Sequence, residues 1–128
     1  MRTVMRDSNN ISQSIGLERL RDELRKFAIE RDWDQFHSPK NLAAALAVEA
    51  AELLEPFQWL TEAQSRSLSA KQKQAVQSEM ADVLLYLVRL ADKLDVDVIA
   101  AATEKIAHNA LKYPIEKSRG SSTKYTEL

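Results

Sequence analysis

The chain has 128 residues, a net charge of −1 and 29% charged side chains, which is ordinary for a soluble protein with one core. A charge this close to zero creates no field that would attract nucleic acid or an anionic membrane. The absence of cysteine excludes disulfides and thiolate metal sites, and a count of two glycines excludes a glycine-rich phosphate loop. No apolar run could span a bilayer and the N-terminus lacks a hydrophobic signal core, so we expect a cytoplasmic protein.

The periodicity of the hydrophobic residues predicts an all-α protein, a bundle-like protomer of four helices. Residues 1–12 are polar and show no period, so we interpret them as a flexible N-terminal arm. The first helix follows and should end near Arg31, because apolar side chains recur at helical spacing from Leu17 to Phe27. The link at 32–37 has no period and carries two aromatic residues and one histidine.

The second helix has a clear start and a clear stop. Ser38 and Pro39 are typical of an N-cap followed by proline in the first turn. The helix should run to about Glu55, because Pro56 lacks an amide donor and clashes with the preceding turn. The segment 61–67 is polar and is expected to form a loop or a short helical turn.

The third helix should run from about Ala70 to Leu94. Ser69 and Gln72 form the pattern of a capping box at its start. Its second half is apolar on nearly every face, and such a helix needs neighbours on several sides. A small bundle can hardly supply them, so we expect a homo-oligomer that shares this helix.

The fourth helix begins with the acidic segment 95–97, whose charges are favoured at the positive end of a helix, and continues to about Lys112. Pro114 should end it. We therefore predict one helical domain at 13–114 and an irregular C-terminal tail at 115–128.

Two pairs of acidic residues lie in nearly apolar helical segments. Residues three apart share a helix face, so Glu49 lies beside Glu52 and Glu79 beside Asp82. Carboxylates in such surroundings are costly unless a positive group meets them, and no Lys or Arg is interleaved. We interpret the four acids as ligands of a metal ion. The alternative interpretation is that each pair lies on a solvated stripe.

Carboxylate oxygens suit a hard cation such as Mg²⁺, which takes carboxylates together with substrate phosphates. Such a metal holds a triphosphate without a glycine loop and activates a water for in-line attack. A di-iron bundle is the nearest rival architecture, but it requires a Glu-x-x-His motif on two helices. Here only Asp34-x-x-His37 has that spacing, and it lies in the link.

The sequence also resembles a known family. Glu49-x-x-Glu52 and Glu79-x-x-Asp82, separated by 26 residues, resemble the metal motif of the all-α nucleoside triphosphate pyrophosphohydrolases, the MazG-like superfamily. The branch that it resembles most is that of the dCTP pyrophosphatases. The matching segments are 31–37, 57–59, 82–88, 113–114, 118–121 and 124–128, and the similarity covers roughly residues 17–128.

This resemblance implies the Mg²⁺-dependent hydrolysis of a (deoxy)nucleoside triphosphate to the monophosphate and diphosphate. It implies assembly into a homodimer or a dimer-of-dimers tetramer. It also implies a house-cleaning role, in which unwanted nucleotides such as 5-modified dCTP are removed. We expect the partners to be the nucleotide and a second copy of the chain, with no nucleic acid and no membrane.

The resemblance further implies candidate substrate contacts. Aromatic side chains and a histidine match positions near the base, and a stripe of the fourth helix matches positions near the phosphates. Each candidate also has an ordinary alternative role. The tryptophans would fill the ends of the bundle, the histidine would belong to a loop or a helix cap, and the tyrosine would pack in the core. The stripe of the fourth helix would be a solvated face, and the arginine in the tail would be a subunit contact. These candidates are Trp33, His37 and Trp59 for the base, Tyr86 for base or sugar, Lys105, Asn109 and Lys112 for the phosphates, and Tyr113 and Arg119 in the remaining matched segments.

Two functions therefore stay open at the level of the sequence. The first is a dNTP pyrophosphohydrolase that favours dCTP or its 5-modified forms. The second is a non-enzymatic helical module for oligomerisation or nucleotide binding. The sequence does not determine the base preference, the number of metal ions, the choice of dimer or tetramer, or whether Glu49, Glu52 or Glu55 orients the attacking water.

Overall fold

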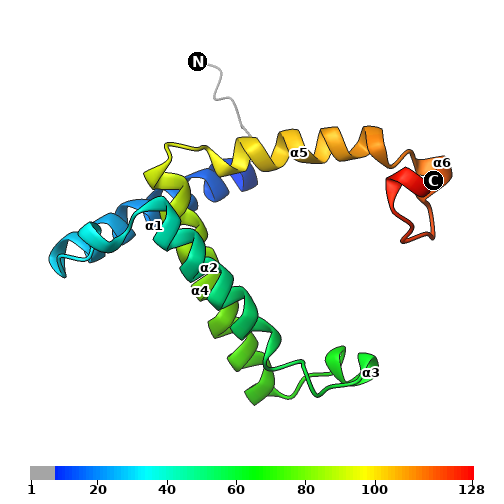
Figure 1. Cartoon of the computed structure of the whole chain (residues 1–128), viewed down its shortest axis with the longest axis horizontal. Helices are drawn as coiled ribbons and strands as arrows, with labels where there is room; N and C mark the ends of the chain where they lie inside the picture. The colour runs from blue at the N-terminus through cyan, green and yellow to red at the C-terminus, as the bar shows by residue number, and fades with distance from the viewer. Residues whose placement is uncertain (1–7) are drawn as a thin grey trace. The chain divides into compact units, whose positions relative to one another are not determined.

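The computed structural model describes the backbone of residues 8–128 and the side chains from residue 16 onward. Every regular element within these residues is helical, which confirms the predicted all-α class (Figure 1). The elements are α1 (Ser8–Glu30), η1 (Asp34–Phe36), α2 (Pro39–Leu54), α3 (Glu62–Ser65), α4 (Ala70–Lys93), α5 (Val98–Lys112), α6 (Ile115–Ser118) and η2 (Tyr125–Glu127). None of the helices described is both long and apolar enough to cross a membrane.

The chain divides into two compact units, one that ends at Asp95 and one that begins at Val96. The first unit holds α1 to α4, and the second holds α5, α6 and η2. Each unit is described by itself. The predicted division into an arm, a helical domain at 13–114 and a tail stays a prediction.

The first unit is built on the pairing of α2 with α4, which run side by side in opposite directions (Figure 1). Leu42 of α2 and the α4 residues Val76 and Val88 are buried in the core of this unit. Helix α1 also packs on α4, and its Ala28 is fully buried.

Local capping explains where α2 and α4 begin. The Ser38 hydroxyl accepts a hydrogen bond from the Asn41 amide at 3.2 Å, and Pro39 occupies the first turn of α2. At α4 the predicted capping box is confirmed, because the Gln72 side chain accepts from the Ser69 amide at 2.9 Å. The ends of both helices lie within one residue of the predicted positions.

The two ends of the chain differ from the sequence-based expectation. Helix α1 begins at Ser8, inside the segment expected to be an arm, because a long helix extends over polar residues once it has formed. Residues 1–7 of that arm lie outside the described residues. The polar connection at 61–67 agrees with the expectation, because it forms the short helix α3, which is capped by a box between Thr61 and Gln64. The tail is not wholly irregular, because Pro114 is followed at once by α6.

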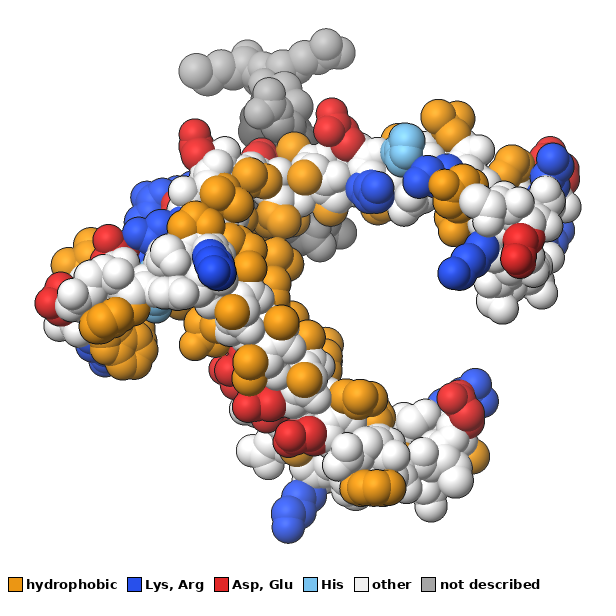
Figure 2. Space-filling model, in the orientation of Figure 1, with side chains coloured by type: hydrophobic (Ala, Val, Ile, Leu, Met, Phe, Trp, Pro, Cys, Tyr) orange, Lys and Arg blue, Asp and Glu red, His pale blue; other side chains and the backbone are white. Residues whose placement is uncertain are grey.

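Many apolar side chains remain at the surface of the described chain (Figure 2). In the first unit, the α4 residues Met80, Leu84 and Leu87 are between 36% and 58% exposed. In the second unit, Ile106 and Leu111 of α5 are 72% and 81% exposed. These faces have no cover within the described part of this chain.

Candidate metal centre

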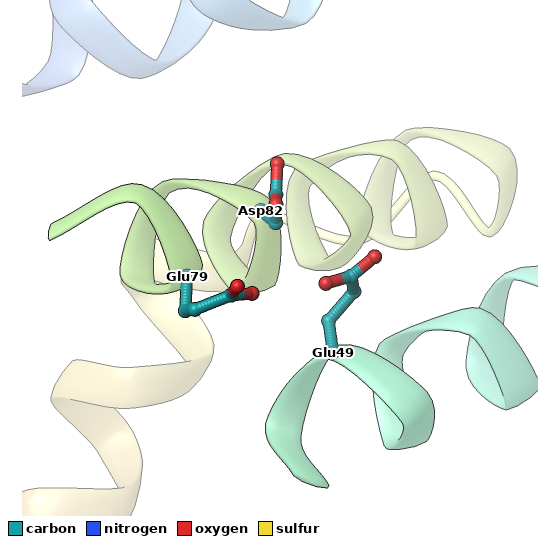
Figure 3. Close-up of side chains that lie close together, drawn as sticks. All are labelled: Glu49, Glu79 and Asp82. Atoms are coloured by element: carbon teal, nitrogen blue, oxygen red, sulfur yellow. The ribbon is translucent and has the colours of Figure 1, made fainter. Parts of the chain in front are cut away.

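Three carboxylates from α2 and α4 converge in the first unit (Figure 3). Glu49 projects from α2, and Glu79 and Asp82 project from one face of α4, where a spacing of three residues places them together. One carboxylate oxygen from each residue lies within 4.8 Å of the other two. All three residues are half-buried. The antiparallel pairing of α2 with α4 therefore brings together three of the four predicted acids, and their role as metal ligands stays a prediction.

The crowding of negative charge changes the protonation of these acids. A hydrogen bond with the Glu52 carboxyl group, together with burial and the charges of the neighbouring acids, raises the pKa of Glu49 to about 7. Burial, followed by the charges of Glu52 and Asp82, also raises the pKa of Glu79. Glu52 therefore lies close to the acids of both helices. It is not part of the group of three acids whose oxygens lie within 4.8 Å of one another.

Two buried oxygens in this cluster are unsatisfied. Glu49 Oε2 and Glu79 Oε2 have no hydrogen-bond partner within the described residues. None of the ion pairs formed by the side chains at 16–128 involves an acid of this cluster. Buried carboxylate oxygens without a partner are costly, and a divalent cation would supply the missing positive charge. The donor set, which contains only oxygen, fits a hard cation such as Mg²⁺.

The candidate base contacts occupy different environments in the first unit. Trp33 is 45% exposed and meets Phe27 edge-on, with ring centroids 5.6 Å apart. Trp59 is 87% exposed, whereas Tyr86 is half-buried on α4, one turn beyond Asp82. His37 is half-buried beside α4. Their contact with a nucleotide stays a prediction.

An ionic network around the buried Arg89, near His37, was not predicted from the sequence. Arg89 of α4 is 5% exposed, and its Nη2 lies 2.6 Å from Asp34 Oδ1. Asp34 also pairs with Lys93, while Asp92 accepts from Arg25 Nε at 2.7 Å. The available signal was Arg89 itself, a charged residue in the apolar half of a helix, which is expensive without partners.

The remaining candidates lie in the second unit, on α5 and after it. Lys105, Asn109 and Lys112 share one face of α5, as the predicted spacing requires, and the first two are exposed. The Lys112 ammonium group lies 4.7 Å from the centroid of the Tyr125 ring, which also meets Tyr113 edge-on at 6.0 Å. Arg119 follows α6 and is exposed. A role for these residues with phosphates stays a prediction.

Comparison with known proteins gives concordant matches. A model of the MazG-like family matches residues 44–128. Proteins named dCTP pyrophosphatase 1 from Rattus norvegicus and Homo sapiens are each 46% identical to the chain over 114 residues, which is 88% of this chain and 67% of theirs. The crystal structure of a pyrophosphatase from Archaeoglobus fulgidus superposes with a TM-score of 0.73 at 41% identity, and covers 77% of this chain and 93% of that one.

Proposed function

The chain belongs to the MazG-like family, and we propose that it is a Mg²⁺-dependent nucleoside triphosphate pyrophosphohydrolase. The class of enzyme is a diphosphatase that acts on a nucleotide anhydride bond, in line with relatives at 44–46% identity that are named dCTP pyrophosphatase 1. The proposed reaction converts a (deoxy)nucleoside triphosphate and water into the monophosphate and diphosphate. The proposed preference is for dCTP or 5-modified dCTP, in a house-cleaning role.

The observation that carries this proposal is the meeting of Glu49, Glu79 and Asp82, where two buried carboxylate oxygens have no hydrogen-bond partner among the described residues. Triphosphates repel a bare cluster of acids, so the nucleotide requires a cation between the two sets of oxygens. When bound, Mg²⁺ would neutralise phosphate charge and polarise the phosphorus that is attacked. Glu52, beside this group, completes the proposed set of four ligands.

The chain's own carboxylates have a second task, which is to orient water. In the proposed reaction a water oxygen bonds to the α-phosphorus, the bond from that phosphorus to the bridging oxygen breaks, and diphosphate leaves. A carboxylate must accept the water's proton. Glu55 is suited to this task because it lies one turn beyond Glu52 and its charge contributes to the raised pKa of Glu79. Glu49 and Glu52 remain the alternatives.

Base recognition is proposed for the aromatic residues of the first unit. Exposed indole rings offer flat surfaces on which a base stacks, and each stack contributes about 1–3 kcal/mol. Trp33 and Trp59 have the required exposure. Tyr86 is proposed to contact base or sugar, and the residues of α5 and the tail are proposed to contact phosphates.

Self-association is part of the same proposal. The exposed apolar residues of α4 and α5 support a homodimer or a dimer-of-dimers tetramer, because burying them removes apolar surface from water.

The function is tested by incubating the full chain with the dNTPs and 5-methyl-dCTP, with Mg²⁺ or with a chelator, and identifying both products. We expect the monophosphate and diphosphate, formed fastest from a cytosine nucleotide and only with the metal. Glu79→Gln should reduce turnover at least about a hundredfold, because it removes a ligand's charge. Glu62→Gln, an exposed acid on α3, is the matched control and should retain wild-type turnover.

Two results would contradict the proposal. The first is the absence of hydrolysis of every nucleotide in the panel. The second is equal metal affinity in wild type and Glu79→Gln, which would favour the alternative of a non-enzymatic nucleotide-binding or oligomerisation module.

A further inference from the structure

Arg89 is the one buried charged residue among the side chains at 16–128. Each of its three guanidinium nitrogens faces a different partner. Nη2 lies 2.6 Å from Asp34 Oδ1, Nη1 lies 3.6 Å from Asp92 Oδ2, and Nε donates a hydrogen bond to His37 Nδ1 at 3.1 Å. The two carboxylates compensate the buried charge, so the bond to the imidazole is not needed for neutrality.

The bond to His37 determines which ring nitrogen carries the proton. Guanidinium nitrogens only donate hydrogen bonds and do not lose their protons, so His37 Nδ1 must present a lone pair. The ring is therefore neutral, with its proton on Nε2. Burial and the nearby charge of Arg89 lower the pKa of His37, which agrees with a neutral ring. No second hydrogen bond to this ring occurs within the described side chains, so the Nε2 proton is available to a ligand.

The position of Arg89 relates the link to the acid cluster. Arg89 follows Asp82 by seven residues, which is close to two full turns, so both lie on the same face of α4. The rise of an α-helix places them about 10 Å apart along that face. Tyr86 lies between them, one turn beyond Asp82. One face of α4 thus leads from the acids, past a half-buried aromatic ring, to the residue that holds His37.

Resting on the proposed function, we infer that Arg89 is a positioning residue for base recognition: it anchors the segment 34–37 to α4 and fixes His37 as a donor through Nε2. A fixed donor recognises an acceptor, which in a pyrimidine is a carbonyl oxygen or an unprotonated ring nitrogen. Cytosine carries both on one edge. An amino group, which only donates, is not bound by this nitrogen.

The first test measures the imidazole directly and needs no activity. In ¹⁵N NMR spectra of the full chain at neutral pH, His37 should carry its proton on Nε2, and its Nδ1 should show coupling to Arg89 Nε through the hydrogen bond. His108, the other histidine, serves as the reference, and His108→Gln assigns the signals. Arg89→Lys should move the Nδ1 shift of His37. A proton on Nδ1, or an unchanged shift in the variant, overturns the inference.

The second test separates positioning from stability by steady-state kinetics with dCTP. Arg89→Lys keeps a cation for Asp34 but lacks the planar fork that also reaches His37. We expect KM to rise about tenfold while kcat changes less than about twofold, as for a lost hydrogen bond in binding. Arg25→Lys is the matched control, because Arg25 contacts Asp92 in the same network but not His37, and its kinetics should equal those of the wild type.

The outcomes are distinguishable. Equal kinetic effects in Arg89→Lys and Arg25→Lys, or an unchanged KM in Arg89→Lys, overturn the positioning role. If circular dichroism shows that Arg89→Lys does not fold, His37→Ala replaces it, because this variant leaves both carboxylate partners of Arg89 in place. The KM of His37→Ala must then rise while its kcat is retained. An unchanged KM in His37→Ala overturns the inference. A wild type that hydrolyses no nucleotide contradicts the proposed function and the base contact, while the NMR result still decides the bond from Arg89 to His37.

Discussion

Glu49 and Glu79 face one another and Asp82 across a small space, and the raised pKa values of both glutamates express this repulsion. Because the pKa of Glu49 is raised to about 7, this carboxyl group keeps its proton up to near-neutral pH in the absence of a cation. A divalent cation competes with that proton for the same oxygens. Metal binding and protonation of this cluster are therefore coupled.

This coupling predicts how metal affinity depends on pH. Because the pKa of Glu49 is raised to about 7, Mg²⁺ must displace a proton below that pH. The affinity for Mg²⁺ should fall by up to about tenfold per pH unit below 7 and level off above it. Isothermal titration calorimetry between pH 5.5 and 8.5 measures this change. Affinity that is independent of pH over this range would contradict the assigned crowding of acids.

The same pKa predicts the pH dependence of stability without metal. Between pH 4.5, the ordinary pKa of this group, and about pH 7, the folded chain keeps a proton on Glu49 that the unfolded chain has lost. The contribution of this proton to the free energy of unfolding is therefore fully present below pH 4.5 and is lost as the pH rises through 7. In chelator, the Tm should therefore fall from pH 5 to pH 8. The lowered pKa values of Asp34 and Asp92 act below this window and leave the slope unchanged.

Glu49→Gln tests the assignment of that slope to one side chain. The amide carries no charge, so the variant should have a higher Tm than the wild type at pH 8 in chelator and a flatter pH profile. Thermal unfolding followed by circular dichroism provides the measurement. An equal slope in the variant would assign the effect to other groups.

Single residues also show what sequence reasoning could reach. The acid pairs were predictable because a spacing of three residues and apolar neighbours are local features. The bonds of Arg89 were not, because its partners His37 and Asp34 lie 52 and 55 residues away in the chain. Local periodicity carries no information about such a pairing.

At the level of elements, the caps determined what could be predicted. Ser38 and Ser69 mark the starts of α2 and α4, and both helices begin where the sequence places them. The box of Thr61 and Gln64 is equally local and was available as a signal for α3. The start of α1 at Ser8 was not predicted, because the polar segment 1–12 shows no helical period that would indicate a helix.

The pairing of α2 with α4 predicts the effect of a core substitution. Leu42 is 1% exposed and is the largest fully buried side chain of the described residues. Leu42→Ala should lower the free energy of unfolding by about 2–5 kcal/mol, through lost burial and a residual cavity. Urea unfolding measures this difference. Lys40→Ala, on the exposed first turn of the same helix, should change it by less than about 0.5 kcal/mol, and comparable losses in both variants would contradict the assigned core.

For the whole molecule, the exposed apolar residues are the main feature that one chain does not explain. Leu84 is 43% exposed on α4, although the surrounding sequence is apolar on nearly every face. If a second copy covers this face, a charge there opposes association. Leu84→Glu should therefore produce a smaller species than the wild type in light scattering and sedimentation. A wild type that is monomeric at micromolar concentration would contradict the proposed assembly.

The central claim is that a divalent cation belongs between the acids of α2 and α4. Crystals of the full chain grown with Mn²⁺ in place of Mg²⁺, and measured for anomalous scattering, test it most directly. The account predicts an anomalous peak within bonding distance of Glu49, Glu79 and Asp82 that is absent from Glu79→Gln crystals. Wild-type crystals with no peak at these carboxylates, or with their oxygens directed away from one another, would contradict it.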